Sequence, residues 1–244
     1  MEVREGMKIL EFSGGKDSIA CLLLLRDQLH DIIVLWADSG DAFPETHAQM
    51  ERVKAMCPNF VVVRGNQPDV IEQGGYPVDV MPMRNHAFIQ HIAQQQREKM
   101  QGFLECCVNS FIVPMHLKAQ ELGATTIIRG QKMSDPHKSP VRSGDVVDGI
   151  TFWFPIENWS DEQVLDFIAG SDLLPAHYAE ARTSLDCMHC TAYLADNQWK
   201  LPYLDKHHPQ VGEEVRRRLI WIKSEVDGDM QYLENIIGGS YGAR

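Results

Sequence analysis

The sequence predicts an α/β fold with three layers: a doubly wound, mostly parallel sheet of about five strands, followed by a C-terminal helical segment. Two observations support this prediction. Short apolar segments recur along the chain and alternate with helical patterns, and glycine-rich or polar segments follow several of them. The length of 244 residues suits one such domain with a small helical appendage. We therefore expect a main domain over residues 1–195 and a helical segment with a tail over 196–244.

Five segments are predicted to be strands because they are short, almost wholly apolar and rich in β-branched or aromatic residues. They are residues 7–12, 32–36, 60–64, 125–129 and 150–155. Such continuous apolar character is typical of strands that are buried on both faces of a parallel sheet.

Helical patterns fill most of the intervals between these strands. The predicted helices cover residues 19–30, 44–56, 85–100, 108–122, 160–169 and 211–237. The helix near residue 160 has a clear start, because Ser160-Asp161-Glu162-Gln163 has the form of a capping box. Residues 65–80 and 131–148 are polar or rich in Gly and Pro, and we expect long loops there.

Composition limits the classes of function. The chain has 23 basic and 34 acidic residues, a net charge of −11, which disfavours an extended nucleic acid as partner. No apolar stretch has the length of a membrane helix, and the first residues lack the apolar core of a signal peptide. We therefore expect a cytoplasmic protein without a membrane partner, in which clustered thiols indicate metal or redox chemistry.

A phosphate-binding turn is predicted between the first strand and the first helix, at Ser13-Gly14-Gly15-Lys16-Asp17-Ser18. Glycines let the backbone approach an anion closely, and the N–H groups and dipole at a helix N-terminus attract negative charge. Ser13 and Ser18 can donate hydroxyl hydrogen bonds, and Lys16 adds a positive charge. The spacing differs from that of a Walker loop.

This turn resembles the Ser-Gly-Gly-x-Asp-Ser loop of the PP-loop superfamily, the adenine nucleotide α-hydrolase-like proteins. Residues 35–46, 128–130 and 155–164 resemble segments of adenylylsulfate and phosphoadenylylsulfate (PAPS) reductases, and the likeness extends over most of residues 8–194. The resemblance implies a Rossmann-like fold and an oxidoreductase of sulfur metabolism. Its nucleotide would be adenylylsulfate, the 3′-phosphorylated form, or ATP.

The resemblance also implies roles for individual residues. Ser13, Gly14, Gly15, Lys16, Asp17 and Ser18 would hold phosphate or sulfate, with Lys16 and Asp17 also catalytic. Ala37 and Asp38 would line the adenine and ribose pocket. Arg129, Gly130, Lys132 and Arg142 would face the anionic end of the substrate, although the three basic residues also fit a solvated loop.

Four cysteines form two close pairs, Cys106-Cys107 and Cys187-x-x-Cys190. Four thiolates suit a tetrahedral zinc ion or a [4Fe–4S] cluster, and the spacing does not choose between them. A dithiol redox pair or buried bystanders would fit as well. Iron–sulfur adenylylsulfate reductases carry the same two pairs around a [4Fe–4S] cluster, so the resemblance implies that cluster, with zinc as the second choice. Cys21 and Cys57 are expected to be packing residues.

The chain departs from the reductase pattern after Cys190, where it has no further cysteine. Reductases of this kind use a cysteine near the C-terminus to attack sulfur. Three interpretations follow: a reductase that uses an external thiol, such as a thioredoxin-like partner; an ATP-dependent sulfur transferase that thiolates tRNA or DNA through adenylylation; or a non-catalytic nucleotide-binding subunit. The family resemblance favours the first, and a homo-oligomer fits any of them.

Overall fold

The computed structural model describes residues 6–92, 98–135, 139–180, 183–185 and 187–238. The chain forms two compact units, and each unit is built from two separate segments. The first unit comprises residues 1–65 and 111–186, and the second comprises residues 66–110 and 187–244. The boundary that we expected after residue 195 lies inside the second unit.

A six-stranded sheet forms the centre of the first unit, in the order β3-β2-β1-β6-β8-β7. Neighbouring strands are parallel except for β7, which pairs with β8 in the antiparallel sense. The strands are β1 Met7–Glu11, β2 Ile32–Asp38, β3 Phe60–Arg64, β6 Ala124–Ile128, β7 Val146–Val147 and β8 Ile150–Trp153. This sheet confirms the predicted α/β fold class, and all five predicted strands are present within a few residues of their expected bounds.

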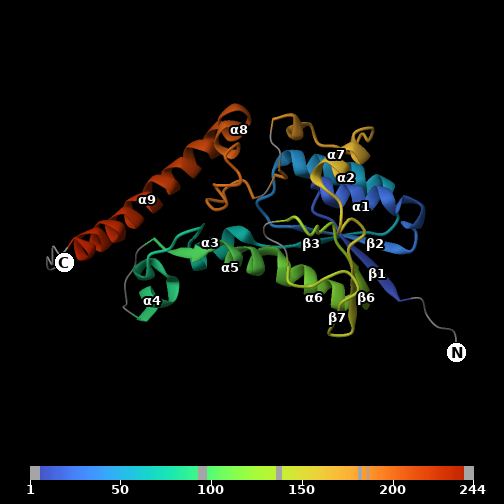
Figure 1. Cartoon of the computed structure of the whole chain (residues 1–244), viewed down its shortest axis with the longest axis horizontal. Helices are drawn as coiled ribbons and strands as arrows, with labels where there is room; N and C mark the ends of the chain where they lie inside the picture. The colour runs from blue at the N-terminus through green and yellow to red at the C-terminus, as the bar shows by residue number, and fades with distance from the viewer. Residues whose placement is uncertain (1–5, 93–97, 136–138, 181–182, 186, 239–244) are drawn as a thin grey trace. The chain divides into compact units, whose positions relative to one another are not determined.

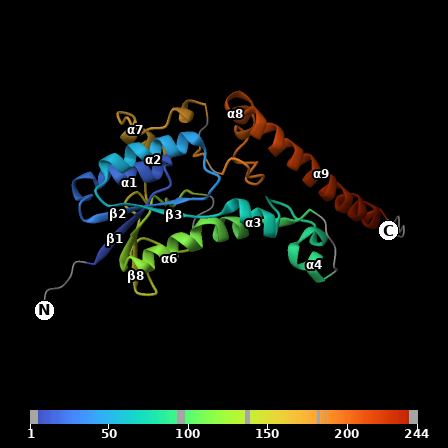
Figure 2. The ribbon, with the colours of Figure 1, turned by 180° about the vertical axis from the view of Figure 1, so that it is seen from behind.

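Helices cover both faces of this sheet (Figures 1 and 2). On one side lie α1 Lys16–Leu24, α2 Pro44–Met56 and α7 Asp161–Ile168, and on the other lies α6 Val113–Glu121. Alternate residues of each strand enter the two cores: Leu10 packs with the α1 side, and its neighbour Ile9 with the α6 side. The first unit therefore has the three layers that its apolar strands require.

Local signals explain the two helices whose bounds were predicted most closely. Pro44 opens α2, because its fixed backbone angle suits a first helical turn. Ser160 caps α7 in a complete capping box with Gln163. Helix α1 differs from the prediction, since it starts at Lys16 and ends at Leu24, before the short 3-10 turn η1 Arg26–Gln28. A second such turn, η4 Ala176–Ala179, follows α7.

The second unit contains elements that the sequence analysis did not predict. Helix α3 Gln67–Gly74 and strand β4 Tyr76–Val78 occupy a segment expected to be a loop. The side chain of Asn66 accepts a hydrogen bond from the Asp69 N–H, and Pro68 lies in the first turn of α3. Both residues therefore start a helix where the polar composition had indicated a loop.

The predicted helix over residues 85–100 is also interrupted. The structure has η2 Met83–Asn85, α4 Ala87–Ile92 and strand β5 Met100–Gly102, while residues 93–97 are outside the described part. Strand β5 pairs with β4 in parallel. It leads into α5 Phe103–Cys107 and a π-helical segment, η3 Val108–Ile112, which precedes α6.

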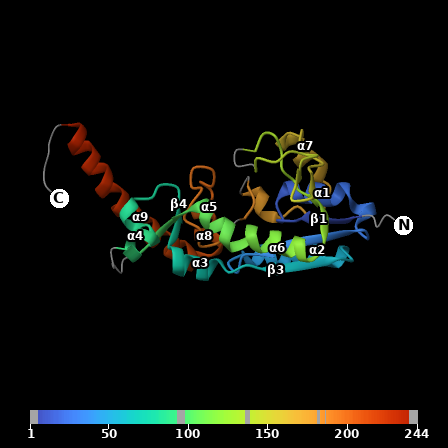
Figure 3. The same cartoon turned by 90° about the horizontal axis from the view of Figure 1, so that it is seen from below.

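Two helices, α8 Lys200–His207 and α9 Pro209–Ile237, form the C-terminal part of the second unit (Figure 3). Helix α8 was not predicted, and α9 begins two residues before the expected helix. The break between them falls at His208, because Pro209 cannot continue the hydrogen bonding of α8. None of the helices described is long and apolar enough to cross a membrane.

Candidate functional site

The turn from β1 into α1 folds as the glycine pattern predicts. Gly14 has a φ of 83°, in the left-handed region that glycine adopts at little cost. The Ser18 hydroxyl accepts from the Gly14 N–H at 3.1 Å and donates to the Gly15 carbonyl at 2.9 Å. Ser13 Oγ accepts from the Gly15 N–H at 3.3 Å. The two serines therefore hold the turn by accepting from the N–H groups of both glycines.

Gly130 lies against this turn, just after the end of β6. A Cβ at Gly130 would stand 2.6 Å from the Asp17 carbonyl carbon and 2.9 Å from the Ser18 nitrogen. Both atoms belong to the backbone and cannot rotate away. The neighbouring strands β1 and β6 thus bring their following loops into direct contact, and this approach requires glycine.

Two lysines and three aspartates form a charge network at the turn. Lys16 Nζ lies 3.1 Å from Asp17 Oδ2 and 2.7 Å from Asp161 Oδ1. Lys132 Nζ lies 2.7 Å from Asp17, 2.9 Å from Asp135 and 3.2 Å from Asp161. The structure thus brings Lys132 to the predicted phosphate turn. Asp135 and Asp161 join it, although the sequence analysis did not single them out as site residues.

Burial and charge set the protonation of this network. Burial by itself lowers the pKa of Lys132, but hydrogen bonds to Asp17 and Asp135 outweigh it, so the pKa is raised and the side chain stays charged. The hydrogen bond from Lys16 lowers the pKa of Asp161. Lys132 is therefore charged and Asp161 ionised near neutral pH.

The segment after α7 also reaches the turn. The Tyr178 hydroxyl accepts a hydrogen bond from the Lys16 backbone N–H at 2.8 Å. A Cβ added at Gly15 would lie 3.2 Å from the Ser184 side chain. His177, next to Tyr178, is buried, and burial lowers its pKa so that the ring is neutral near pH 7. No sequence motif marks these residues, because they reach the turn only through the fold.

The other two predicted basic residues have different partners. Arg129 forms an ion pair with the buried Glu11 at the end of β1, and its guanidinium lies 5.2 Å from the centre of the Phe152 ring. Arg142 is exposed, and its Nη1 lies 2.7 Å from the sulfur of Met133. Among the contacts described for these three basic residues, the one that reaches the turn is that of Lys132 with Asp17.

Ala37 and Asp38 end β2, at the same carboxyl edge of the sheet as the turn. Both are half-buried. The Asp38 carboxylate accepts from the Gly40 N–H at 3.0 Å, and its carbonyl accepts from the Gly65 N–H at 2.6 Å. The position at the edge agrees with a nucleoside pocket, and the contacts described are those of a strand-end turn.

All four candidate metal ligands belong to the second unit. Cys106 is buried, and Cys107, Cys187 and Cys190 are half-buried. The Cys190 N–H donates to the Cys187 carbonyl at 3.2 Å, which closes the Cys-x-x-Cys turn. Within the residues that the structure describes, no three His, Cys, Asp or Glu side chains meet in a group that could hold a metal ion. The donor types suit a thiolate-bound centre, and the arrangement described does not assemble one.

Two cations contact the backbone of the Cys-x-x-Cys turn. Lys200 is only 2% exposed, and its ammonium donates to the Cys187 carbonyl at 2.7 Å. Arg218 of α9 donates to the His189 carbonyl at 3.3 Å. Positive charge beside cysteines favours the thiolate, which is the form that binds metals.

Cys21 and Cys57, in contrast, lie in the apolar core of the first unit. Burial raises the pKa of the Cys21 thiol to about 12 and that of Cys57 to about 11. Both thiols stay protonated near neutral pH, as expected of packing residues.

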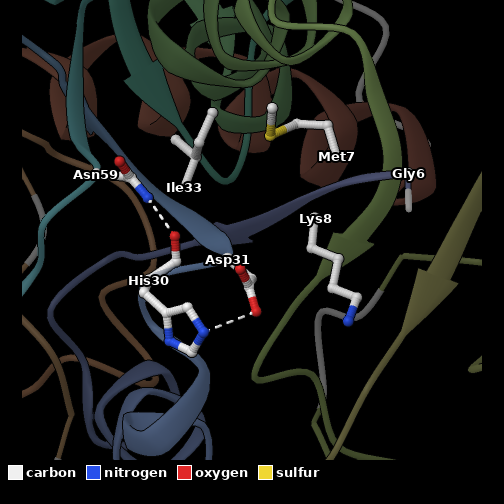
Figure 4. Close-up of a pocket in the computed structure, with 7 residues that line it drawn as sticks. All are labelled: Gly6, Met7, Lys8, His30, Asp31, Ile33 and Asn59. Carbon is white, nitrogen blue, oxygen red and sulfur yellow. Dashed lines mark hydrogen bonds and ion pairs between the residues drawn. The ribbon is translucent and has the colours of Figure 1, made fainter. Parts of the chain in front are cut away.

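A cavity of about 300 Å³ in the first unit lies at the other end of the strands (Figure 4). It is lined by the beginnings of β1 and β2, with Lys8, His30, Asp31 and Asn59 among its residues. His30 pairs with Asp31 at 3.0 Å, and Asn59 donates to the His30 carbonyl at 2.9 Å. Ligands of open parallel sheets bind at the carboxyl ends of strands, so we do not assign the nucleotide to this cavity.

Comparisons with known proteins give one family match and one similar solved structure. A family model described as the phosphoadenosine phosphosulfate reductase domain matches residues 8–193. A search of curated protein sequences finds no match. Among solved structures, the chain is similar to a phosphoadenylyl-sulfate (PAPS) reductase from Candida auris in a phosphate complex. That match has 14% sequence identity and a TM-score of 0.48, and it covers 73% of this chain and 79% of the other.

Proposed function

Because this chain belongs to the phosphoadenosine phosphosulfate reductase family, we propose that it binds a sulfated adenine nucleotide at the Ser13–Ser18 turn and reduces its sulfate group to sulfite. The observation that carries the proposal is the turn itself. Its glycine in the left-handed region, its backbone N–H groups and Lys16 stand together at the N-terminus of α1. Such an arrangement suits a phosphate or sulfate oxygen.

The proposed reaction needs a thiol that is not provided after Cys190. A thiolate from a thioredoxin-like partner or a small dithiol attacks the sulfur, and the bond between sulfur and the phosphate oxygen breaks. The leaving group is AMP when the substrate is adenylylsulfate. It is adenosine 3′,5′-bisphosphate when the substrate is the 3′-phosphorylated form. A second thiolate attacks the thiol sulfur of the resulting thiosulfonate, which releases sulfite and forms a disulfide. The sulfur gains the two electrons that the dithiol loses.

We also propose that Cys106, Cys107, Cys187 and Cys190 bind a [4Fe–4S] cluster, with zinc as the second choice. Support comes from the location of all four cysteines in one compact unit and from the cations at the Cys-x-x-Cys turn. A bound cluster would supply a local electrostatic field and a rigid link between the two cysteine pairs. Iron, sulfide and zinc analysis of protein purified without oxygen tests this assignment.

Sulfite release tests the main proposal. Protein prepared without oxygen is incubated with adenylylsulfate or its 3′-phosphorylated form, together with dithiothreitol or thioredoxin. We expect sulfite above the protein-free control, with a loss of at least about tenfold in Lys16→Met, because a charge-assisted hydrogen bond to the ligand contributes about 1.5–3 kcal/mol. Lys54→Met, an exposed lysine of α2, is the matched control and should retain the activity.

Two other outcomes would contradict the reductase proposal. Pyrophosphate release from ATP without any sulfite would favour the ATP-dependent sulfur transferase. Binding of adenylylsulfate without either product would favour a nucleotide-binding subunit. Equal nucleotide affinity in the wild type and in Lys16→Met would remove the assignment of the turn.

A further inference from the structure

Lys16 presents two groups to the predicted anion site, and both already have partners from the later part of the first unit. Its ammonium lies 2.7 Å from Asp161 Oδ1, and its backbone N–H donates to the Tyr178 hydroxyl at 2.8 Å. These are the groups that the proposed function assigns to a phosphate or sulfate oxygen. An aspartate and a tyrosine therefore stand where the anion would bind.

Two carboxylates already hold the ammonium of Lys16 in this arrangement. A lysine carries three N–H donors. The carboxylate oxygens of Asp17 lie 3.1 and 3.2 Å from Nζ, and Asp161 Oδ1 is the third acceptor at 2.7 Å. An anion that binds Lys16 therefore competes with two carboxylates for the ammonium and meets their negative charge.

Asp161 is the partner that can be released most easily. Its side chain is 59% exposed, whereas that of Asp17 is 27% exposed and also holds the buried Lys132 at 2.7 Å. Lys132 is 1% exposed and contacts three carboxylates, so it is fixed in place and supports Asp17. Lys16, with a side chain that is 12% exposed and two carboxylate partners, is therefore the more accessible cation of the network.

We propose that Asp161 is an affinity-determining residue of the anion site: it pairs with Lys16 in the free protein and competes with a phosphate or sulfate group for that ammonium. Tyr178 has the same effect on the backbone N–H. This inference rests on the proposed function, because it assumes an anion at the turn. It adds that Asp161 and Tyr178 lower the affinity of the site for the anion.

The proposal predicts the sign of a substitution. Asp161→Asn removes the charge that competes for Lys16 and keeps a side chain of the same size at the start of α7. A neutral amide holds an ammonium less strongly than a carboxylate does. A direct role of Asp161 in holding the ligand, alone or through a divalent cation, predicts weaker binding instead.

Titration calorimetry with inorganic pyrophosphate, with and without Mg²⁺, measures the effect. We expect Asp161→Asn to bind pyrophosphate about three- to tenfold more tightly than the wild type at low salt, as for release of a partly exposed ion pair next to an anion. Tyr178→Phe should also bind more tightly. Glu162→Gln makes the same change in net charge at the next position of α7, has no contact with Lys16, and should stay within about twofold.

A double substitution separates competition from a general charge effect. In the Lys16→Met background, Asp161→Asn should gain less affinity than in the wild type, because only Lys132 remains of the two lysines that Asp161 contacts. Circular dichroism and thermal unfolding check that each variant folds. Weaker binding by both Asp161→Asn and Tyr178→Phe overturns the proposal, and so does an equal gain in Glu162→Gln.

The test also distinguishes this inference from the proposed function. Tighter pyrophosphate binding by Asp161→Asn with no sulfite from any sulfated nucleotide would leave the inference in place and refute the reductase. Sulfite release by the wild type, with unchanged pyrophosphate affinity in Asp161→Asn, would support the reductase and refute this inference. Absence of binding of pyrophosphate and of nucleotides to the wild type would overturn both.

Discussion

Replacing Gly130 by alanine should destabilise the first unit and weaken nucleotide binding at the same time. The added Cβ would lie 2.6 Å from the Asp17 carbonyl carbon and 2.8 Å from its oxygen, well inside the 3.4 Å at which ordinary contact begins. The atoms that it meets are backbone, so the turn must move. Overpacking of this kind costs about 1–3 kcal/mol. The displaced residue, Asp17, carries the contacts to both lysines of the charge network.

Urea unfolding and pyrophosphate calorimetry on the same preparations measure the two effects. We expect Gly130→Ala to lower the free energy of unfolding by about 1–3 kcal/mol and the melting temperature by about 2–4 °C per kcal/mol. Gly170→Ala is the matched control, because a Cβ at Gly170 meets nothing within 4 Å. It should leave stability and affinity nearly unchanged.

Gly15→Ala gives an intermediate case. Its Cβ would meet the Ser184 side chain at 3.2 Å, and a side chain can rotate where backbone cannot. We expect a smaller loss of stability than for Gly130→Ala. Wild-type stability and affinity in Gly130→Ala would refute the close approach of the two loops.

Two further predictions concern the buried Lys200 and His177. Lys200→Met should lower the metal affinity of the second unit by about tenfold or more, because it removes a contact that supports a proposed ligand. Lys206→Met, at an exposed position of α8, is the control and should leave the metal affinity unchanged. Competition with a chelator measures both affinities. Equal affinities would contradict a role of Lys200 in supporting the thiolates. The lowered pKa of His177 means that the unfolded chain binds a proton more readily, so stability should fall as the pH drops below 6.5. Urea unfolding at pH 7 and pH 5 measures how much free energy of unfolding each protein loses between the two pH values. This loss should be smaller in His177→Asn than in the wild type, by at most about 1.4 kcal/mol per pH unit. An equal loss in the two proteins would refute the prediction.

Features with a local cause could be predicted from the sequence. The phosphate turn, α2 and α7 depend on residues next to one another, such as the capping box of Ser160 with Gln163. The strands are short apolar segments that have few alternatives in a buried sheet. Segment 67–74 was interpreted as a loop because its composition is polar, although Asn66 and Pro68 are helix-start signals that could have identified α3.

Contacts between distant residues could not be predicted in this way. Asp161 is 145 positions from Lys16, and Lys132 is 115 positions from Asp17. Only the pairing of β1 with β6 and the packing of α1 against α7 bring them together. Arg129 illustrates the same limit, because its partner Glu11 lies on the neighbouring strand and a solitary arginine in the sequence gives no sign of it.

The way the chain is divided between its two units has a consequence for how the protein can be made and cut. Each unit uses two separate segments, so the chain passes from one to the other after residues 65, 110 and 186. No single cleavage releases either unit whole. During synthesis β1 must wait for β6, more than a hundred residues later, before it has both of its neighbours. Replacing residues 66–110 by a short linker and removing residues 187–244 is the route to an isolated first unit, because it joins that unit's own two segments.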